Sequence, residues 1–171
     1  RISQELESEN PEVYYAISNV LYKMEDYWDS LFYAKRATHF DNTDARFHVL
    51  YGKINSRLKI HKESAKGFLK AVELNPELLY HWILLTDELI KERKYDRALK
   101  FLHDSLHFHG NSGLILFRLA ALYYKTNRLR YSLKYFRKGM LIDQKRYKEF
   151  FKICPEAKKS SEINKVLKDI T

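Results

Sequence analysis

Hydrophobic residues recur at helical spacing along most of this chain. Between residues 80 and 108, Trp82, Leu85 and Leu89 lie three and four positions apart, and a second series with similar spacing begins at Tyr95. Apolar positions three to four residues apart share one face of an α-helix, so this stretch predicts two amphipathic helices joined by a short charged turn. Two such short helices cannot bury their apolar faces on each other alone, so the pair requires neighbours.

The same pattern returns every 34 residues. Each second helix carries a small residue near its start and another two turns later, where neighbouring helices must approach closely. The register holds over four copies without an insertion, which predicts a tandem array of four helix pairs. The small residues are Ser30, Ser64, Ala98 and Ser132 in the first column, and Ala37, Ala71, Ser105 and Gly139 in the second.

Local signals mark where several of these helices begin. Asn10 precedes Pro11, and Asn75 precedes Pro76, so an amide side chain can cap a helix whose first residue needs no backbone N–H. Together with the periodicity, these signals predict eight helices with short connections. The expected ranges are 11–23, 27–39, 44–58, 61–73, 77–91, 95–108, 113–125 and 129–142.

The two ends of the chain depart from the repeat. We expect residues 1–9 to form the last turns of a preceding second helix, and residues 10–144 to hold the four repeats. Residues 145–171 are predicted to form C-terminal capping helices, the first of which ends at Pro155. Four lysines would keep the outer face of this cap in water. They are Lys158, Lys159, Lys165 and Lys168.

These positions resemble the tetratricopeptide repeat (TPR), a helix–turn–helix unit of 34 residues. The resemblance covers about residues 11–144 and implies an all-α fold, a right-handed α-solenoid of stacked antiparallel helix pairs. The glycine of the first helix is replaced in three repeats by the small residues Ser18, Thr86 and Ala120. The matching residues are Trp82 with Leu85, Tyr51 with Gly52, Ala98 with Leu102, Ser64 with Phe68, and Ala71 with Pro76.

The resemblance also implies a function. In TPR proteins the first helix of each repeat lines a concave groove that holds a peptide or a partner helix. Aromatic and aliphatic anchors with a few charges suit such binding, although large residues could instead fill the groove by packing on each other. Tyr15 and Leu50 replace polar residues of the family's two-carboxylate clamp, which argues against chaperone tails as ligands. The predicted peptide-binding residues are Tyr15, Asn19, Tyr22, Arg46, Val49, Lys53, Tyr80, Ile83, Asp87, Phe117, Arg118 and Tyr124.

Charge is distributed unevenly and supports an alternative function. The net charge of the 171 residues is +9, but residues 1–90 carry −3 and residues 91–171 carry +12. A basic half with interleaved aromatic residues is also typical of nucleic-acid binding. The alternative partner is therefore nucleic acid, and self-association stays open. The cations concerned are Lys125, Arg128, Arg130, Lys134, Arg137, Lys138, Lys145, Arg146 and Lys152, and the aromatic residues are Tyr131, Tyr135, Phe136 and Tyr147.

The sequence offers little support for catalysis or metal binding. His103 and His107 are four residues apart, a spacing that can hold zinc, but no third ligand lies nearby and both are predicted to face solvent. Cys154, the single cysteine, excludes an internal disulfide and is predicted to be a buried packing residue in a reducing, cytoplasmic protein. No apolar run approaches the ~18 residues of a membrane helix. We therefore expect a non-enzymatic protein-binding scaffold without cofactor or metal, and without membrane insertion.

Overall fold

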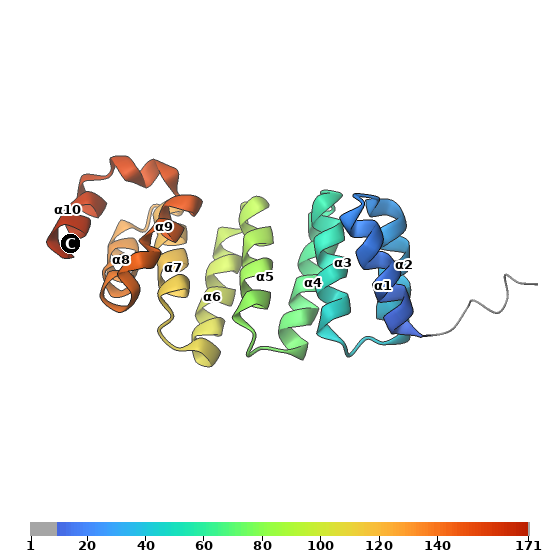
Figure 1. Cartoon of the computed structure of the whole chain (residues 1–171). Coiled ribbons are helices and arrows are strands. Elements are labelled where there is room, and N and C mark those ends of the chain that lie inside the picture. Colours follow the sequence, from blue (N-terminus) through green and yellow to red (C-terminus); the bar gives the residue numbers. More distant parts are fainter. Residues whose placement is uncertain (1–9, 171) are drawn as a thin grey trace, which may run out of the picture. The chain divides into compact units, whose positions relative to one another are not determined.

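The computed structural model describes residues 10–170, which form helices and contain no strand. Residues 1–9, expected to end a preceding helix, lie outside this part. The eight predicted helices are present, and each begins and ends within two residues of its expected range (Figure 1). They are α1 (Pro11–Lys23), α2 (Tyr27–Phe40), α3 (Ala45–Arg57), α4 (His61–Leu74), α5 (Leu79–Lys91), α6 (Tyr95–His109), α7 (Gly113–Lys125) and α8 (Leu129–Asp143).

Shorter elements follow α8. They are the 3₁₀ helices η1 (Gln144–Tyr147) and η2 (Pro155–Lys159), and the α-helices α9 (Lys148–Ile153) and α10 (Ser161–Ile170). The chain divides into two compact units, residues 1–88 and residues 89–171, with the boundary inside α5. Each unit is described by itself. Helix α1 packs on α2 and α3 packs on α4 in the N-terminal unit, and α7 packs on α8 in the C-terminal unit.

The turn between the two helices has the same backbone geometry in all four helix pairs. Four non-glycine residues, each 34 positions from the next, adopt positive φ of 57–65°: Glu25, Lys59, Arg93 and Asn127. In the second turn, the N–H of Ile60 donates to the carbonyl of Asn55 at 2.8 Å, and the N–H of Lys59 donates to that of Ser56 at 3.1 Å. These are the two hydrogen bonds of a Schellman motif, which reverses the chain directly after a helix.

Because only glycine adopts positive φ without steric strain, Lys59→Gly should stabilise the protein by about 0.5–1 kcal/mol despite the greater freedom that glycine gives the unfolded chain. Urea denaturation followed by circular dichroism measures this change. Lys62→Gly is the matched control, since Lys62 is an exposed residue within α4. It should destabilise by up to about 1 kcal/mol, since glycine forms helices less readily than lysine. Equal effects of the two substitutions would contradict this explanation of the turn.

Small residues allow the helices of a pair to touch, as the repeat pattern predicts. Ser18 and Ser30 are fully buried, and each hydroxyl donates to the other residue's carbonyl oxygen, at 2.9 and 2.8 Å. A methyl group at Gly52 would lie 2.6 Å from the ring of Phe68, closer than any side chain could remain without movement. The small columns are therefore contacts between helices.

The core of the N-terminal unit joins successive pairs. Leu31 and Ala34 of α2 pack with Leu50 and Ile54 of α3. Nearby, Tyr14 and Ala37 form a second cluster with Phe47, which is 1 % exposed. The second helix of one pair thus covers the first helix of the next pair, so helices α1–α4 form one continuous layered core.

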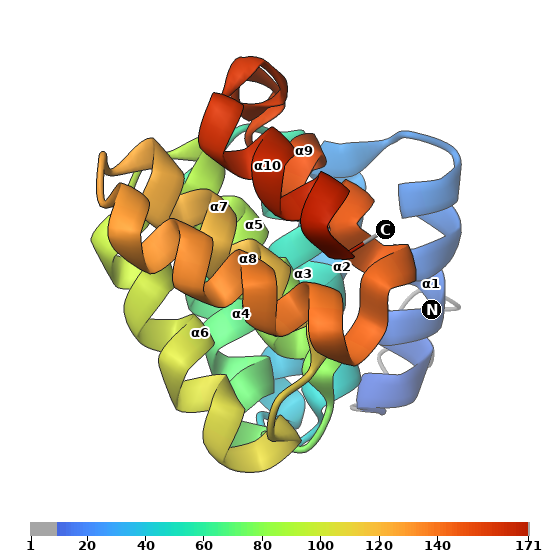
Figure 2. The same ribbon diagram turned by 90° about the vertical axis from the view of Figure 1, so that its left-hand side faces the viewer.

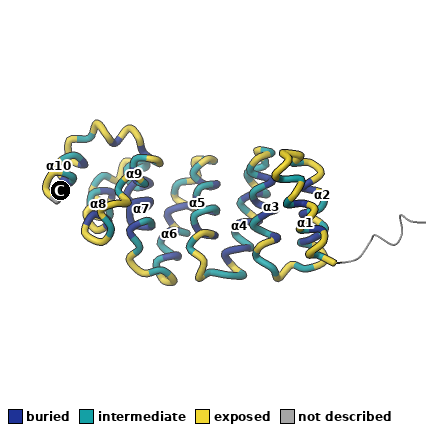
Figure 3. Tube along the Cα trace, in the orientation of Figure 1, coloured by how far each residue is buried: buried dark blue, intermediate teal, exposed yellow. Residues whose placement is uncertain are grey.

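In the C-terminal unit, helices α9 and α10 lie against the last repeat pair. Helix α9 packs on α7, and α10 packs on α8 (Figure 2). Phe150 of α9 is fully buried between Phe136 and the other rings of this cluster, and Ile163 of α10 is buried in the same cluster. Because α6, α8 and α9 all pack on it, α7 is buried along most of its length (Figure 3).

Candidate peptide-binding surface

The N-terminal unit contains a cavity of about 240 Å³ lined by residues from three first helices. Helix α1 contributes side chains at positions i, i+4 and i+7, and α3 contributes a similar set, because this spacing keeps residues on one helical face. Helix α5 supplies two residues from its first turn. The lining residues are Tyr15, Asn19 and Tyr22 of α1, Arg46, Val49, Leu50 and Lys53 of α3, and Tyr80 and His81 of α5.

Seven of the twelve residues predicted from the sequence line this cavity. The other two lining residues, Leu50 and His81, were not predicted, because Leu50 was considered only as an apolar replacement at a clamp position and no motif marks His81. Leu50 is 5 % exposed, and the buried His81 ring makes a 3.0 Å hydrogen bond through Nδ1 to the carbonyl of Ala71. Both residues are therefore buried and also form the base of the cavity, a double role that the spacing of residues along one helix does not reveal.

Arg46 at the edge of the cavity is held by two carboxylates. Its guanidinium donates to Asp44 at 2.6 and 2.9 Å and also to Glu12, while lying 5.5 Å from the centroid of the Tyr15 ring. Hydrogen bonding from Arg46 holds the pKa of Asp44 below its ordinary value, and the two carboxylates raise the pKa of Arg46. The positive charge of Arg46 is therefore already matched within the chain.

Lys53 is different. Its ammonium lies 5.5 Å from the centroid of the exposed Tyr80 ring, and no carboxylate within residues 10–170 pairs with it. On the α1 side, Tyr22 accepts a 3.4 Å hydrogen bond from Arg57. The cavity thus combines three tyrosine rings with one cation that no carboxylate of the described residues neutralises.

The dimensions of the cavity limit what it can hold. Small-molecule pockets usually enclose about 300–1,000 Å³, and this cavity of about 240 Å³ is smaller and open to solvent. One or two side chains of a peptide would fill it. Its composition, aromatic walls with few polar groups, is suited to gripping such side chains.

The remaining predicted residues lie outside this cavity. Ile83 and Asp87 are half-buried on α5. Phe117, Arg118 and Tyr124 belong to the C-terminal unit, and the expectation that Phe117 and Arg118 are accessible is wrong: Phe117 is fully buried and Arg118 is 4 % exposed. The repeat register identifies the face of α7 on which Phe117 lies, but it cannot show that a cap helix packs on α7. Phe117 instead stacks edge-on against Phe136 at 5.5 Å in the core.

Phe117→Ala should therefore destabilise the protein by about 3–5 kcal/mol, because it opens a cavity in a closed core. Tyr80→Ala is the comparison, since the Tyr80 ring is 51 % exposed. That change should cost below about 1 kcal/mol. Urea denaturation of both variants provides the measurement, and a Phe117→Ala protein as stable as the wild type would contradict the core assignment.

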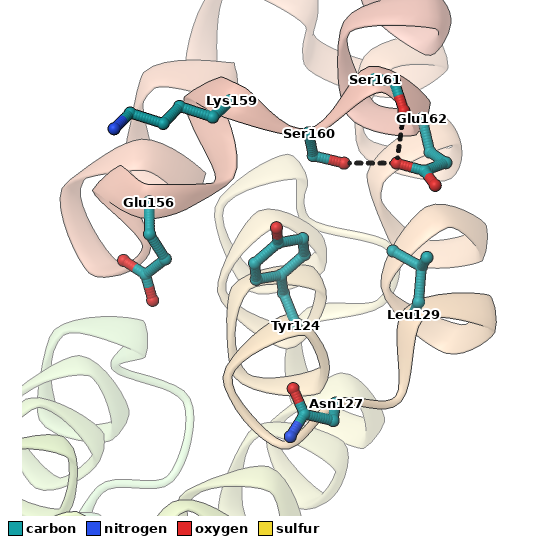
Figure 4. Close-up of a pocket in the computed structure, with 8 residues that line it drawn as sticks. All are labelled: Tyr124, Asn127, Leu129, Glu156, Lys159, Ser160, Ser161 and Glu162. Carbon is teal, nitrogen blue, oxygen red and sulfur yellow. Dashed lines mark hydrogen bonds between the residues drawn. The ribbon is translucent and has the colours of Figure 1, made fainter.

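Tyr124 lines a second cavity, in the C-terminal unit (Figure 4). This cavity of about 450 Å³ is open and is lined by polar and apolar groups in similar measure, and its walls come from the end of α7, the start of α8, η2 and the start of α10. Ser160 and Ser161 both donate to the carboxylate of Glu162, at 2.9 and 3.0 Å. The N–H of Glu162 and these two hydroxyls hold the pKa of Glu162 below its ordinary value. Ser160, Ser161 and Glu162 thus satisfy one another, and the lining holds one lysine, Lys159, with two carboxylates, Glu156 and Glu162.

The two histidines of the candidate metal pair lie in different environments. His107 is exposed as predicted, but the expectation for His103 is wrong because it is half-buried. Its ring makes a 2.8 Å hydrogen bond to the hydroxyl of Tyr123 and lies edge-on to Tyr135, and burial lowers its pKa. Among residues 10–170, no three His, Cys, Asp or Glu side chains are grouped as metal ligands would be.

Cys154 is fully buried in the C-terminal core, as the sequence predicts. Burial raises the pKa of its thiol to about 12, and the neighbouring Glu156 adds to the effect. A thiolate is the reactive form of cysteine, so this environment is the opposite of one that activates a nucleophile.

The folded protein should therefore resist alkylation by iodoacetamide at pH 8, where the thiol stays protonated and covered. In urea, Cys154 should react completely at the same pH, since its pKa returns to about 8.5. Mass spectrometry after timed quenching distinguishes the two states. Rapid modification of the native protein would contradict this assignment.

The basic half carries several matched charges. Among the nine predicted nucleic-acid-binding cations, four pair with carboxylates, and Phe136 is fully buried, so it cannot stack on a base. Tyr131 remains 52 % exposed. The ion pairs are Lys125–Glu156, Arg128–Asp96, Arg146–Asp143 and Lys152–Glu149.

In the described part of the chain, no helix combines the length and apolarity needed to cross a membrane. The cytoplasmic location stays a prediction.

Comparison with known proteins identifies the fold. No protein-family model matches the chain, and no curated protein matches it. Solved structures do match. YrrB, a TPR protein with an unusual peptide-binding site, gives a TM-score of 0.69 at 17 % identity, covering 98 % of this chain and 88 % of YrrB. MamA from Desulfovibrio magneticus RS-1 gives 0.70 at 15 % identity, covering 94 % and 92 %.

A further MamA structure gives a TM-score of 0.71 at 15 % identity, over 84 % of this chain and 79 % of its own. Similarity at these identities establishes the fold. The chain has the all-α solenoid fold of TPR proteins, built from repeated helix pairs, and the resemblance inferred from the sequence is confirmed.

Proposed function

We propose that this chain is a non-enzymatic protein-interaction scaffold that binds a peptide segment on its first helices, at the cavity between α1, α3 and α5. The observation that carries the proposal is the convergence of Tyr15, Tyr22 and Tyr80 around an opening of peptide side-chain size, with Lys53 at its edge. Tyrosines supply large contact areas at a low entropic cost, which makes them effective anchors in interfaces.

The charges of the cavity favour one class of ligand. Arg46 is neutralised by Asp44 and Glu12, whereas Lys53 has no carboxylate partner in residues 10–170. An apolar or aromatic anchor would fill the cavity, and a carboxylate next to it would pair with Lys53. The preferred ligand is therefore a peptide that carries an apolar residue close to an acidic one.

A random-peptide display library, selected on the immobilised protein at ~0.15 M salt, tests this proposal. Binding of one selected, fluorescein-labelled peptide is then measured by fluorescence polarisation. Tyr80→Ala should weaken binding at least ~30-fold, as expected for a central anchor. Lys53→Gln should weaken it ~5-fold through the loss of one exposed charge pair.

Two matched variants serve as controls. Tyr131→Ala removes a tyrosine of equal exposure, 52 % against 51 % for Tyr80, from the C-terminal unit. Lys62→Gln removes an exposed lysine from α4. Both should bind the selected peptide as the wild type does. If Tyr80→Ala and Lys53→Gln also bind unchanged while folded, the cavity is not the binding site.

A further inference from the structure

The first described helix pair carries an unusually apolar outer surface. Seven of the thirteen exposed large hydrophobic residues lie in α1, α2 and the turn between them, although these segments form a small part of residues 10–170. Large exposed apolar patches on proteins mark interaction sites. Four of the seven form a single line along α1 and its C-cap: Val13, Ile17, Val20 and the C-cap residue Met24, which are 40, 36, 56 and 71 % exposed.

The repeat register shows that this line is a helix-packing surface. Thirty-four residues later, the positions of Val13 and Val20 are occupied by Phe47 and Ile54, which are 1 % and 0 % exposed. Those residues are covered by α2, through its cluster contacts. The α1 line therefore has the form of a surface that receives another helix.

Trp28 and Phe32 of α2 add to the apolar surface of this helix pair, although the repeat pattern does not require an apolar residue at either position. They are 66 % and 53 % exposed. In the other three repeats the corresponding positions hold charged residues, so packing within the chain does not require an aromatic residue there. These charged residues are Lys62, Asp96 and Arg130, and Lys66, Lys100 and Lys134.

The spacing along α1 indicates the geometry of the receiving contact. The intervals of four, three and four residues are those of alternating a and d positions in a coiled coil, with no charged side chain in the line. Ala16, next to the line, is small enough to let a second helix approach closely. A helix whose apolar residues have the same spacing can pack on this line. A second copy of α1 is such a helix.

Charge at the two ends of α1 selects the orientation. Glu12 lies in the first turn and Lys23 in the last turn. They are eleven residues apart, close to three full turns, so both lie on the same side of the apolar line. Lys23 has no carboxylate partner in residues 10–170. If two copies of α1 pack antiparallel, Glu12 of each lies at the end where Lys23 of the other lies, whereas parallel packing brings like charges together. Arg46 of the same chain occupies only Oε1 of Glu12, and the Glu12 side chain is 54 % exposed, so its second carboxylate oxygen can accept from Lys23 of the other copy.

We propose that this face, composed of Val13, Ile17, Val20 and Met24, binds the same face of a second copy of the chain. The two α1 helices pack antiparallel about a twofold axis between Ile17 and Val20. Such a contact is isologous and therefore ends at the dimer. The peptide cavity uses Tyr15, Asn19 and Tyr22, on another side of α1, so dimer formation leaves it open.

Sedimentation equilibrium over a concentration series tests the assembly. The full chain should reach twice the monomer mass and no higher. Val20→Glu combined with Met24→Glu should raise the dimer dissociation constant at least ~100-fold, because both interface copies lose two apolar contacts. The matched control, Leu141→Glu with Ile142→Glu, changes two exposed apolar residues of α8 and should leave the dimer intact. Circular dichroism establishes that both variants fold.

Cross-linking tests the orientation. An equimolar mixture of Val13→Cys and Met24→Cys chains should form a disulfide-linked heterodimer under mild oxidation, while either variant alone should not. A same-position cross-link at Val13 would overturn the antiparallel arrangement. A monomeric chain at every concentration, growth beyond the dimer, or a dimer unaffected by the α1 substitutions would overturn the proposal. A monomer whose Val20→Cys thiol resists alkylation would assign residues 1–9 of the same chain as the cover.

Discussion

Every helix pair in this chain has two apolar faces and can cover only one of them by itself. The pairs are short, and each turn reverses the chain at a single residue of positive φ. Serine, alanine and glycine then let the two helices touch. The contact leaves the opposite face of each first helix uncovered, and another helix must pack there. This constraint explains the layered core of α1–α4, where Leu31 and Ala34 of one pair cover Ile54 of the next.

The same constraint has different outcomes at the two ends of the described chain. In the C-terminal unit, α9 and α10 are not repeat helices, yet they bury Phe117, Phe136 and Phe150 in one cluster. On α1 the corresponding face remains open, with Val20 at 56 % exposure. An uncovered apolar face of this kind is available for association between chains, since its residues already have the a and d spacing of a coiled-coil interface.

The cavity of the N-terminal unit is built directly on its core, since Tyr15 and Tyr22 pack against the cluster that contains Leu50. The core contacts fix the rotation of α1 and α3, so Tyr15, Tyr22 and Lys53 point into one cavity rather than in separate directions. Rigid helices can hold such a constellation more exactly than loops can. The turn geometry and the small-residue columns therefore position the residues of the proposed peptide site, although none of them lines it.

Much of this organisation is encoded in local sequence. The spacing of apolar residues and the 34-residue period determine the eight helices and the small columns, since these depend on which face of a helix a residue occupies. Seven cavity residues follow from the same register. The burial of Phe117 and of His103, and the role of His81 at the base of a cavity, were decided only by the tertiary structure. Each depends on which non-repeated or distant helix packs on a given face, and the periodicity of a single helix carries no information about its neighbours.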